Sequence, residues 1–293
     1  MSSRMHDPTA ALQAQHSLSR TLFLTDLDGT LLGPDQRTSG RTNELINRMV
    51  QEGMRFSYAT ARSWYSAHRV TAGMEARFPI IVYNGAMVLD SQTREILLSN
   101  YFSQEESDEI LRSLLEAGTS PVVYAMPGGK ESFIYNLHSM NAPTRDFVLS
   151  RPNDPRDTPV ESDESLFAQN TFYFTCIDTP ERLAPLNEKY KDRYHCVYGA
   201  DIYSGEQWLE IMPLAASKAN AARQLMKLMD CEHLVAFGDG LNDTDMFALA
   251  DEAYAVENAH PDLKALATAV IGPHSEDSVA LWLKERWSRM QPT

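Results

Sequence analysis

An apolar run that ends in two acids limits most strongly what this chain can fold into. In "TLFLTDLDGTLLG", residues 21–33, mostly apolar residues lead directly into Asp26 and Asp28. Residues i and i+2 of a strand point to the same side, so the two carboxylates can converge on one site where the strand ends. Gly29 then lets the chain turn tightly. The pattern predicts a buried strand with acidic chemistry at its carboxyl end.

Two plainer interpretations of these acids have to be weighed. Acids that follow a strand often cap a helix or form an Asx turn, and this stretch alone leaves that interpretation open. A calcium loop that starts at Asp26 would need glycine at position 31 and glutamate at position 37. The chain has Leu31 and Arg37 there, which excludes that loop.

A second stretch, "VAFGDGLND" at 235–243, shows the same pattern. An apolar run leads into Asp239, and Asp243 follows four residues later. A dinucleotide-binding fingerprint would need glycine at position 243, and Asp243 there excludes it. Magnesium takes one or two carboxylates together with water and phosphate oxygens, and Asp26 and Asp239 at neighbouring strand ends would supply them. With such a cation offsetting the repulsion, Asp26 could be a nucleophile while Asp28 works as acid and base.

The order of apolar runs and amphipathic stretches predicts an α/β fold. Strand, helix and strand alternate at the start of the chain and again after Pro213, which is typical of a parallel sheet with ligands at its carboxyl edge, where Asp26, Thr60 and Asn84 would lie. Between them, hairpins and helices predict an inserted α+β domain. The expected divisions are a flexible tail at 1–19, a Rossmann-like core at 20–86 and 214–293, and an α+β cap at 87–213, with a polar loop at 150–165.

Composition restricts the partners. The chain has 293 residues, a formal net charge of −14 and a pI near 5.0, which argues against binding nucleic acid or anionic membranes. Three cysteines without a CxxC pair signal neither a zinc ribbon nor a disulfide framework. The first 19 residues lack the apolar region of a secretory signal, and no run of 18 apolar residues occurs. We expect a cytoplasmic protein, as a monomer or homodimer.

The four motifs together resemble those of the haloacid dehalogenase superfamily of aspartate-nucleophile phosphotransferases. They are "DLDGT", Thr60 in "SYATAR", Lys218 in "AASKANA" and "GDGLND", in that order. The large insertion, with "YNGA" at 83–86, is similar to the Cof-type branch with a subfamily IIB cap. This resemblance implies a Mg²⁺-dependent phosphatase that hydrolyses small phosphorylated metabolites, such as sugar phosphates, through an aspartyl phosphate.

The resemblance also implies a role for individual residues. Asp26 would attack phosphorus, and Asp28 would serve as acid and base. The remaining roles fall into three groups: phosphate binding by Thr60, Ala61 and Lys218; substrate binding by Arg62, Asn84 and Asn242; and Mg²⁺ binding by Asp26, Asp28 (through its backbone carbonyl), Asp239 and Asp243.

Two departures from the family pattern concern positioning. Ala61 stands where the family commonly has glycine, which gives the backbone less freedom near the phosphate, and "PLAAS" before Lys218 replaces the usual Gly-Val-Ser. Neither change removes a chemical group. Two other functions stay open: a phosphosugar mutase of the same superfamily, and a non-catalytic Mg²⁺-binding switch phosphorylated at Asp26.

Overall fold

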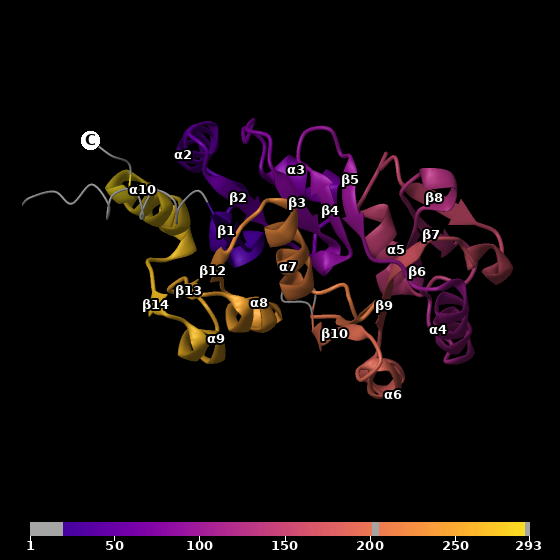
Figure 1. The fold of residues 1–293 in the computed structure, drawn as a ribbon. Coiled ribbons are helices and arrows are strands. Elements are labelled where there is room, and N and C mark those ends of the chain that lie inside the picture. Colours follow the sequence, from indigo (N-terminus) through magenta and orange to yellow (C-terminus); the bar gives the residue numbers. More distant parts are fainter. Residues whose placement is uncertain (1–19, 201–204, 291–293) are drawn as a thin grey trace, which may run out of the picture. The chain divides into compact units, whose positions relative to one another are not determined.

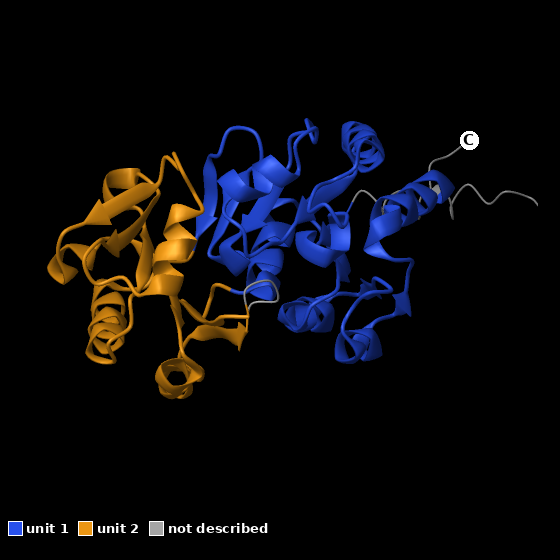
Figure 2. Cartoon of the chain, turned by 180° about the vertical axis from the view of Figure 1, so that it is seen from behind, with its two compact units in different colours: residues 1–99, 217–293 blue, residues 100–216 orange. Residues whose placement is uncertain are grey.

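The chain is divided into two compact units. The computed structural model describes residues 20–200 and 205–290 (Figure 1). Unit 1 comprises residues 1–99 and 217–293, and unit 2 comprises residues 100–216 (Figure 2). The tail expected at 1–19 lies outside the described residues. The division falls at 99/100 and 216/217, whereas the sequence pattern places it at 86/87 and 213/214.

Unit 1 contains a parallel sheet in which the first strand of the chain is central. The strand order is β14-β13-β12-β1-β2. The bounds are β1, Thr21–Thr25; β2, Arg55–Tyr58; β12, His233–Gly238; β13, Glu252–Ala255; and β14, Ala269–Val270. All five residues of β1 are buried, as expected for a strand with neighbours on both edges and helices on both faces. The predicted core sheet is therefore present, built from both ends of the chain.

A small antiparallel sheet explains why unit 1 extends to residue 99. Its order is β3-β4-β5, with β3 at Pro79–Val82, β4 at Met87–Asp90 and β5 at Ile96–Ser99. The turn at 83–86 reverses the chain, so that β4 pairs directly with β3. Ala59, just beyond β2, forms a parallel bridge with Ile81. Residues 87–99 thus belong with the strand they pair with.

Among the described residues of unit 1, six α-helices accompany the sheets. They are α2 (Gly40–Gln51), α3 (Trp64–Val70), α7 (Lys218–Leu228), α8 (Thr244–Leu249), α9 (Pro261–Leu266) and α10 (Ser278–Met290). Serine side chains cap the amino ends of α2, α3 and α7 by accepting a backbone N–H. Between residues 20 and 290, leaving aside 201–204, none of the helices combines the length and the apolar character needed to cross a bilayer.

Unit 2 is built on a six-stranded mixed sheet. Its order is β10-β11-β9-β6-β7-β8. The bounds are β6, Val122–Ala125; β7, Ser132–Asn136; β8, Asp157–Val160; β9, Thr171–Asp178; β10, His195–Ala200; and β11, Gln207–Met212. As the two alternating runs predict, β6 and β7 pair antiparallel across the short turn η3 (Pro127–Gly129). Among the described strands of this sheet, β7 and β8 form the one parallel pair.

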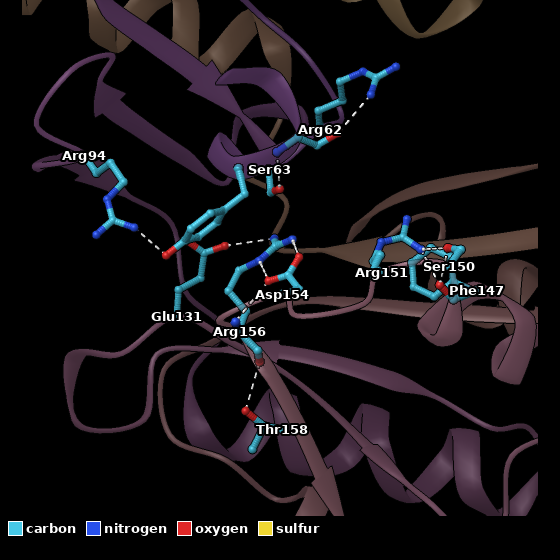
Figure 3. Close-up of polar contacts among 12 residues, drawn as sticks. Arg62, Ser63, Arg94, Glu131, Phe147, Ser150, Arg151, Asp154, Arg156 and Thr158 are labelled. Carbon is cyan, nitrogen blue, oxygen red and sulfur yellow. Dashed lines mark hydrogen bonds and ion pairs between the residues drawn. The ribbon is translucent and has the colours of Figure 1, made fainter. Parts of the chain in front are cut away.

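The prediction of a polar loop at 150–165 is wrong, because this segment contains β8 and most of the short helix η4 (Asp163–Leu166). A proline inside the segment speaks against a strand, yet β8 lies at the sheet edge, where proline is tolerated. Arg156, only 4% exposed, fixes the approach to β8. Its guanidinium donates to both carboxylate oxygens of Asp154, at 2.9 and 2.6 Å, and to Glu131 at 3.1 Å (Figure 3).

The hydrophobic core of unit 2 lies where α4 (Gln104–Glu116) and α6 (Pro180–Tyr190) pack on one face of the sheet. Leu114 from α4, Leu183 from α6 and Ile211 from β11 are each fully buried there. A third helix, α5 (Ala142–Leu149), packs on β9. The expected α+β composition of the insertion is present.

Glu210 gives unit 2 a pH-dependent stability. Burial raises the pKa of its carboxyl to about 7, against a hydrogen bond from Tyr173 that lowers it. Because the folded-state pKa exceeds the unfolded one, neutral Glu210 stabilises the fold fully below about pH 4, and this contribution is lost as pH rises through 7. We expect Glu210→Gln to raise the melting temperature at pH 8 relative to the wild type, but not at pH 4. Calorimetry at both pH values measures this, and an equal shift at both would contradict it.

Candidate active site

The register of the parallel sheet places the predicted site residues at one edge. Thr25 at the end of β1 pairs with Phe237 of β12 and with Tyr58 of β2. The backbone N–H of Asp26 donates to the Phe237 carbonyl at 2.9 Å, one residue before Gly238. Asp26, Asp239 and Thr60 therefore follow three adjacent strands at the same carboxyl edge, where parallel sheets gather their ligands.

Three carboxylates and one lysine form the centre of this edge. Asp26, Asp239 and Asp243 each offer an oxygen, and these oxygens lie within 4.8 Å of one another. Lys218 Nζ donates to Asp26 Oδ1 at 2.6 Å and to Asp243 Oδ1 at 2.7 Å. Lys218 is only 1% exposed and Asp243 is fully buried. The structure thus brings the carboxylates of Asp26 and Asp239 close together, and their role in a common metal site stays a prediction.

Local hydrogen bonds hold the acids in place. Asp243 Oδ2 accepts the backbone N–H groups of Asp239 and Gly240, at 3.1 and 3.2 Å. Thr30 donates its hydroxyl to Asp239 Oδ1 at 2.9 Å. Gly29 has φ +72°, and a Cβ there would lie 2.3 Å from Asp239 Oδ2. The glycine after the paired acids therefore both turns the chain and leaves room for the third carboxylate.

Burial, together with the charges of neighbouring groups, shifts the pKa values in the cluster. Burial raises the pKa of Asp26 well above its usual value; Lys218 opposes the shift and the other two acids reinforce it. Burial, with Asp243, raises the pKa of Asp239 to about 6. Burial alone would lower the pKa of Lys218, but Asp243 and Asp26 outweigh it, so that the pKa rises. Three acids near one ammonium, which binds two of them, make a site suited to a further cation.

The second predicted motif lies next to the cluster along the sheet. Thr60 is 1% exposed, and its hydroxyl oxygen accepts the backbone N–H of Arg62 at 3.1 Å. Ala61 is exposed. The Arg62 guanidinium donates to both oxygens of Asp28, from Nε at 2.8 Å and from Nη2 at 2.6 Å. Arg62, expected to bind substrate, contacts the predicted acid and base in this structure.

A strained turn at residues 83–85 contacts both the second motif and the residue before Lys218 of the third motif. Tyr83, Asn84 and Gly85 form η2 and have φ values of 52°, 52° and 100°. The backbone N–H of Asn84 donates to the Thr60 carbonyl at 2.9 Å. A Cβ on Gly85 would lie 2.3 Å from the carbonyl oxygen of Ser217, the residue before Lys218. Asn84, only 3% exposed, is thereby held against Thr60, while the next residue, Gly85, lies against Ser217.

Not every predicted residue joins the cluster, and two supporting residues were missed. Asn242 lies on the short helix η5 (Leu241–Asp243) and is exposed. Thr30, which binds Asp239, was not singled out although it belongs to the "DLDGT" motif. Asn258 donates to the Gly29 carbonyl at 2.8 Å. The position of Asn258 in the sequence indicates this role, because it follows β13, which lies next to β12 in the same sheet.

The contact of Gly85 with Ser217 predicts a specific sensitivity. We expect Gly85→Ala to lower the free energy of unfolding by more than the roughly 1–3 kcal/mol that a left-handed non-glycine residue costs, because its methyl group also overlaps the Ser217 carbonyl. Gly53→Ala is the matched control: Gly53 has φ 101°, and a Cβ there meets nothing within 4 Å. Chemical denaturation of both variants measures the difference, and equal losses would show that the turn does not press on Ser217.

Known proteins resemble this chain in sequence or in fold. A relative from Serratia proteamaculans, HMP-PP phosphatase, is 26% identical over 273 residues, covering 90% of this chain and 94% of its own. A Bacillus subtilis relative, 5-amino-6-(5-phospho-D-ribitylamino)uracil phosphatase, is 26% identical over 89% of this chain and 96% of its own. The fold is similar to that of BT4131, described as a HAD subclass IIB sugar phosphatase, with TM-score 0.69, 19% identity, and coverage of 90% and 98% of the two chains.

The model of one protein family matches nearly the whole chain. It is described as haloacid dehalogenase-like hydrolase and spans residues 23–283, from the first motif into α10. The family and the relatives named as phosphatases support a phosphatase. The fold and the resemblance inferred from the four motifs are confirmed: this chain belongs to the haloacid dehalogenase-like hydrolases.

Proposed function

We propose that this protein is a Mg²⁺-dependent phosphatase that hydrolyses small phosphate monoesters through a phosphorylated Asp26. The observation that carries the proposal is the cluster of Asp26, Asp239 and Asp243, in which Asp26 and Asp243 bind the buried ammonium of Lys218. Such a cluster is costly in a folded protein unless charge is balanced. A bound dication would offset the excess negative charge.

The donor set of the cluster fits magnesium. Carboxylate oxygens are hard ligands, and Mg²⁺ commonly uses one or two of them while keeping water and phosphate oxygens. Asp26 and Asp239 would hold the ion directly, with the Asp28 backbone carbonyl. Asp243, whose oxygens already accept from Lys218 and two backbone N–H groups, would orient the others or bind through water. The bound ion would neutralise charge on the transferring phosphoryl group.

In the first step, Asp26 would attack phosphorus in line with the leaving oxygen. The new bond joins a carboxylate oxygen to phosphorus, and the bond from phosphorus to the substrate oxygen breaks. Asp28 would give its proton to the departing alkoxide. Thr60 and Lys218 would donate to the phosphoryl oxygens, where the negative charge of the transition state is located.

In the second step, water would attack the phosphorylated Asp26. Asp28, now a carboxylate, would take the proton from water, and the bond between phosphorus and the Asp26 oxygen would break to release phosphate. Both residues then regain their starting protonation. Asp28 is suited to both steps because its side chain is 43% exposed, whereas Asp26 is nearly buried.

The proposed substrates are sugar phosphates or related small monoesters. The printed name of the Bacillus subtilis relative contains a phosphorylated small molecule, and the acidic chain, with net charge −14, disfavours nucleic-acid phosphates. Unit 2 would be the inserted cap that selects the substrate. Asn84 and Asn242 would contribute amide groups for phosphate or substrate.

Metal binding should be visible without turnover. We expect Mg²⁺ at about 100 times its dissociation constant to stabilise the protein by about 2.7 kcal/mol, measured as a rise in melting temperature after treatment with chelator and re-addition. Asp239→Asn should abolish most of this rise. Asp245→Asn, an exposed aspartate on α8, is the matched control and should keep it. No Mg²⁺-dependent shift in the wild type would refute the metal site.

Substitution of Asp26 and substitution of Asp28 should affect the reaction in different ways. We expect Asp26→Asn to lower phosphate release by at least roughly 10⁴-fold, because the nucleophile is lost, with the fold intact by circular dichroism. Asp28→Asn should slow both steps and leave phosphorylated protein detectable by mass spectrometry with an activated acyl or aryl phosphate. Substantial phosphate release by Asp26→Asn would contradict the covalent mechanism.

Product analysis separates the two other functions. A mutase would convert one phosphosugar isomer into another without net phosphate, because a sugar hydroxyl replaces water as acceptor. A phosphorylation switch would hold a stable phospho-Asp26 with negligible turnover. The half-exposed Asp28 next to the site favours hydrolysis, since it is a ready base for water.

A further inference from the structure

Asp28 is held by a two-pronged contact. Arg62 Nε donates to Asp28 Oδ2 at 2.8 Å, and Nη2 donates to Oδ1 at 2.6 Å. Two parallel N–H···O bonds between guanidinium and carboxylate fix both the distance and the orientation of the acid. Lysine cannot reproduce this geometry. The predicted acid and base therefore has its plane set by one side chain.

Arg62 is itself fixed from several directions. Its backbone N–H donates to Thr60 Oγ1 at 3.1 Å, and its carbonyl accepts from the Tyr83 N–H at 3.0 Å. Its guanidinium also donates from Nη1 to Ser66 Oγ, at 2.9 Å, in the first turn of α3. Arg62 thus transmits the position of the second motif to Asp28.

The need for such a hold follows from the surroundings of Asp28. It lies in the turn η1 (Leu27–Leu31), where the backbone leaves helical values at Asp28 and Gly29. Its side chain is 43% exposed, compared with 8% for Asp26 and 0% for Asp243. A half-exposed carboxylate on a turn is free to rotate, and a misplacement of about 1 Å costs a catalytic group roughly 10²-fold in rate.

We propose that Arg62 is a positioning residue that directs Asp28 toward the leaving oxygen. The two N–H bonds hold the carboxylate form that acts as base in the second step, and one of them remains when the other oxygen carries the proton that the first step needs. This inference rests on the proposed phosphatase function and adds the way in which its acid is directed. It differs from the expectation that Arg62 binds substrate: the guanidinium acts through Asp28, and Ser66 supports it from α3.

The test uses a series of aryl phosphates, from p-nitrophenyl phosphate to phenyl phosphate, with the full-length protein and Mg²⁺. Good leaving groups depart without a proton, whereas poorer ones need the acid. We expect Arg62→Gln to lower kcat/KM for phenyl phosphate by about 10²-fold and for p-nitrophenyl phosphate far less. The dependence of kcat/KM on the leaving group should therefore steepen.

Three further variants make the result decisive. Arg62→Lys keeps the positive charge but loses the paired N–H bonds to Asp28, and its dependence of kcat/KM on the leaving group should resemble that of Arg62→Gln. Ser66→Ala leaves the ion pair in place and should steepen the dependence to a smaller extent. Arg69 is an exposed arginine on α3, the helix that carries Ser66. Arg69→Gln should match the wild type.

The contrary outcomes are distinct. An equal loss for all aryl phosphates would assign Arg62 a general structural role, and a rise in KM with unchanged kcat would assign it substrate binding. Wild-type behaviour of Arg62→Lys would show that charge alone suffices. Each of these overturns the inference while the phosphatase stands. A wild-type protein that releases no phosphate from any aryl phosphate would instead count against the proposed function.

Discussion

The buried ammonium of Lys218 is the interaction on which the site depends. It lies between Asp26 and Asp243, at 2.6 and 2.7 Å, and connects α7 to the end of β1 and to η5, which follows β12. A lysine that is 1% exposed is stable only with such partners. The same ammonium brings the acids together and moderates their repulsion, so the geometry of the site and its charge have one origin.

Small residues surround this pair wherever another group has to approach. Gly29 leaves space for the Asp239 carboxylate, and Gly85 leaves space for the Ser217 carbonyl that precedes Lys218. Arg62 and Asn84 then fasten the neighbouring turns by hydrogen bonds to Asp28 and Thr60. Motifs that are far apart in the sequence therefore form one rigid edge, in which the position of each polar group is set by its neighbours.

The sequence predicted the elements whose signals are local, and missed what depends on pairing. β1 and β12 were predicted because long apolar runs end in acids, and the parallel register then brings Asp26 and Asp239 together. β8 was missed because its proline is acceptable only at an edge, which a sequence does not reveal. The contact of Arg62 with Asp28 was also missed, since it depends on the angle between two turns. The catalytic roles of these residues stay predictions.

The discontinuity of unit 1 has a consequence for synthesis on the ribosome. Thr21 of β1 pairs with His233 of β12, so the central strand of the sheet is made 212 residues before one of its two neighbours. At about 5–20 residues per second, this gap lasts roughly 10–40 seconds. Throughout it, β1 has one open, apolar edge of the kind that recruits other strands. The nascent chain, rather than the finished protein, is the species most exposed to aggregation, while the continuous unit 2 can already close its own core.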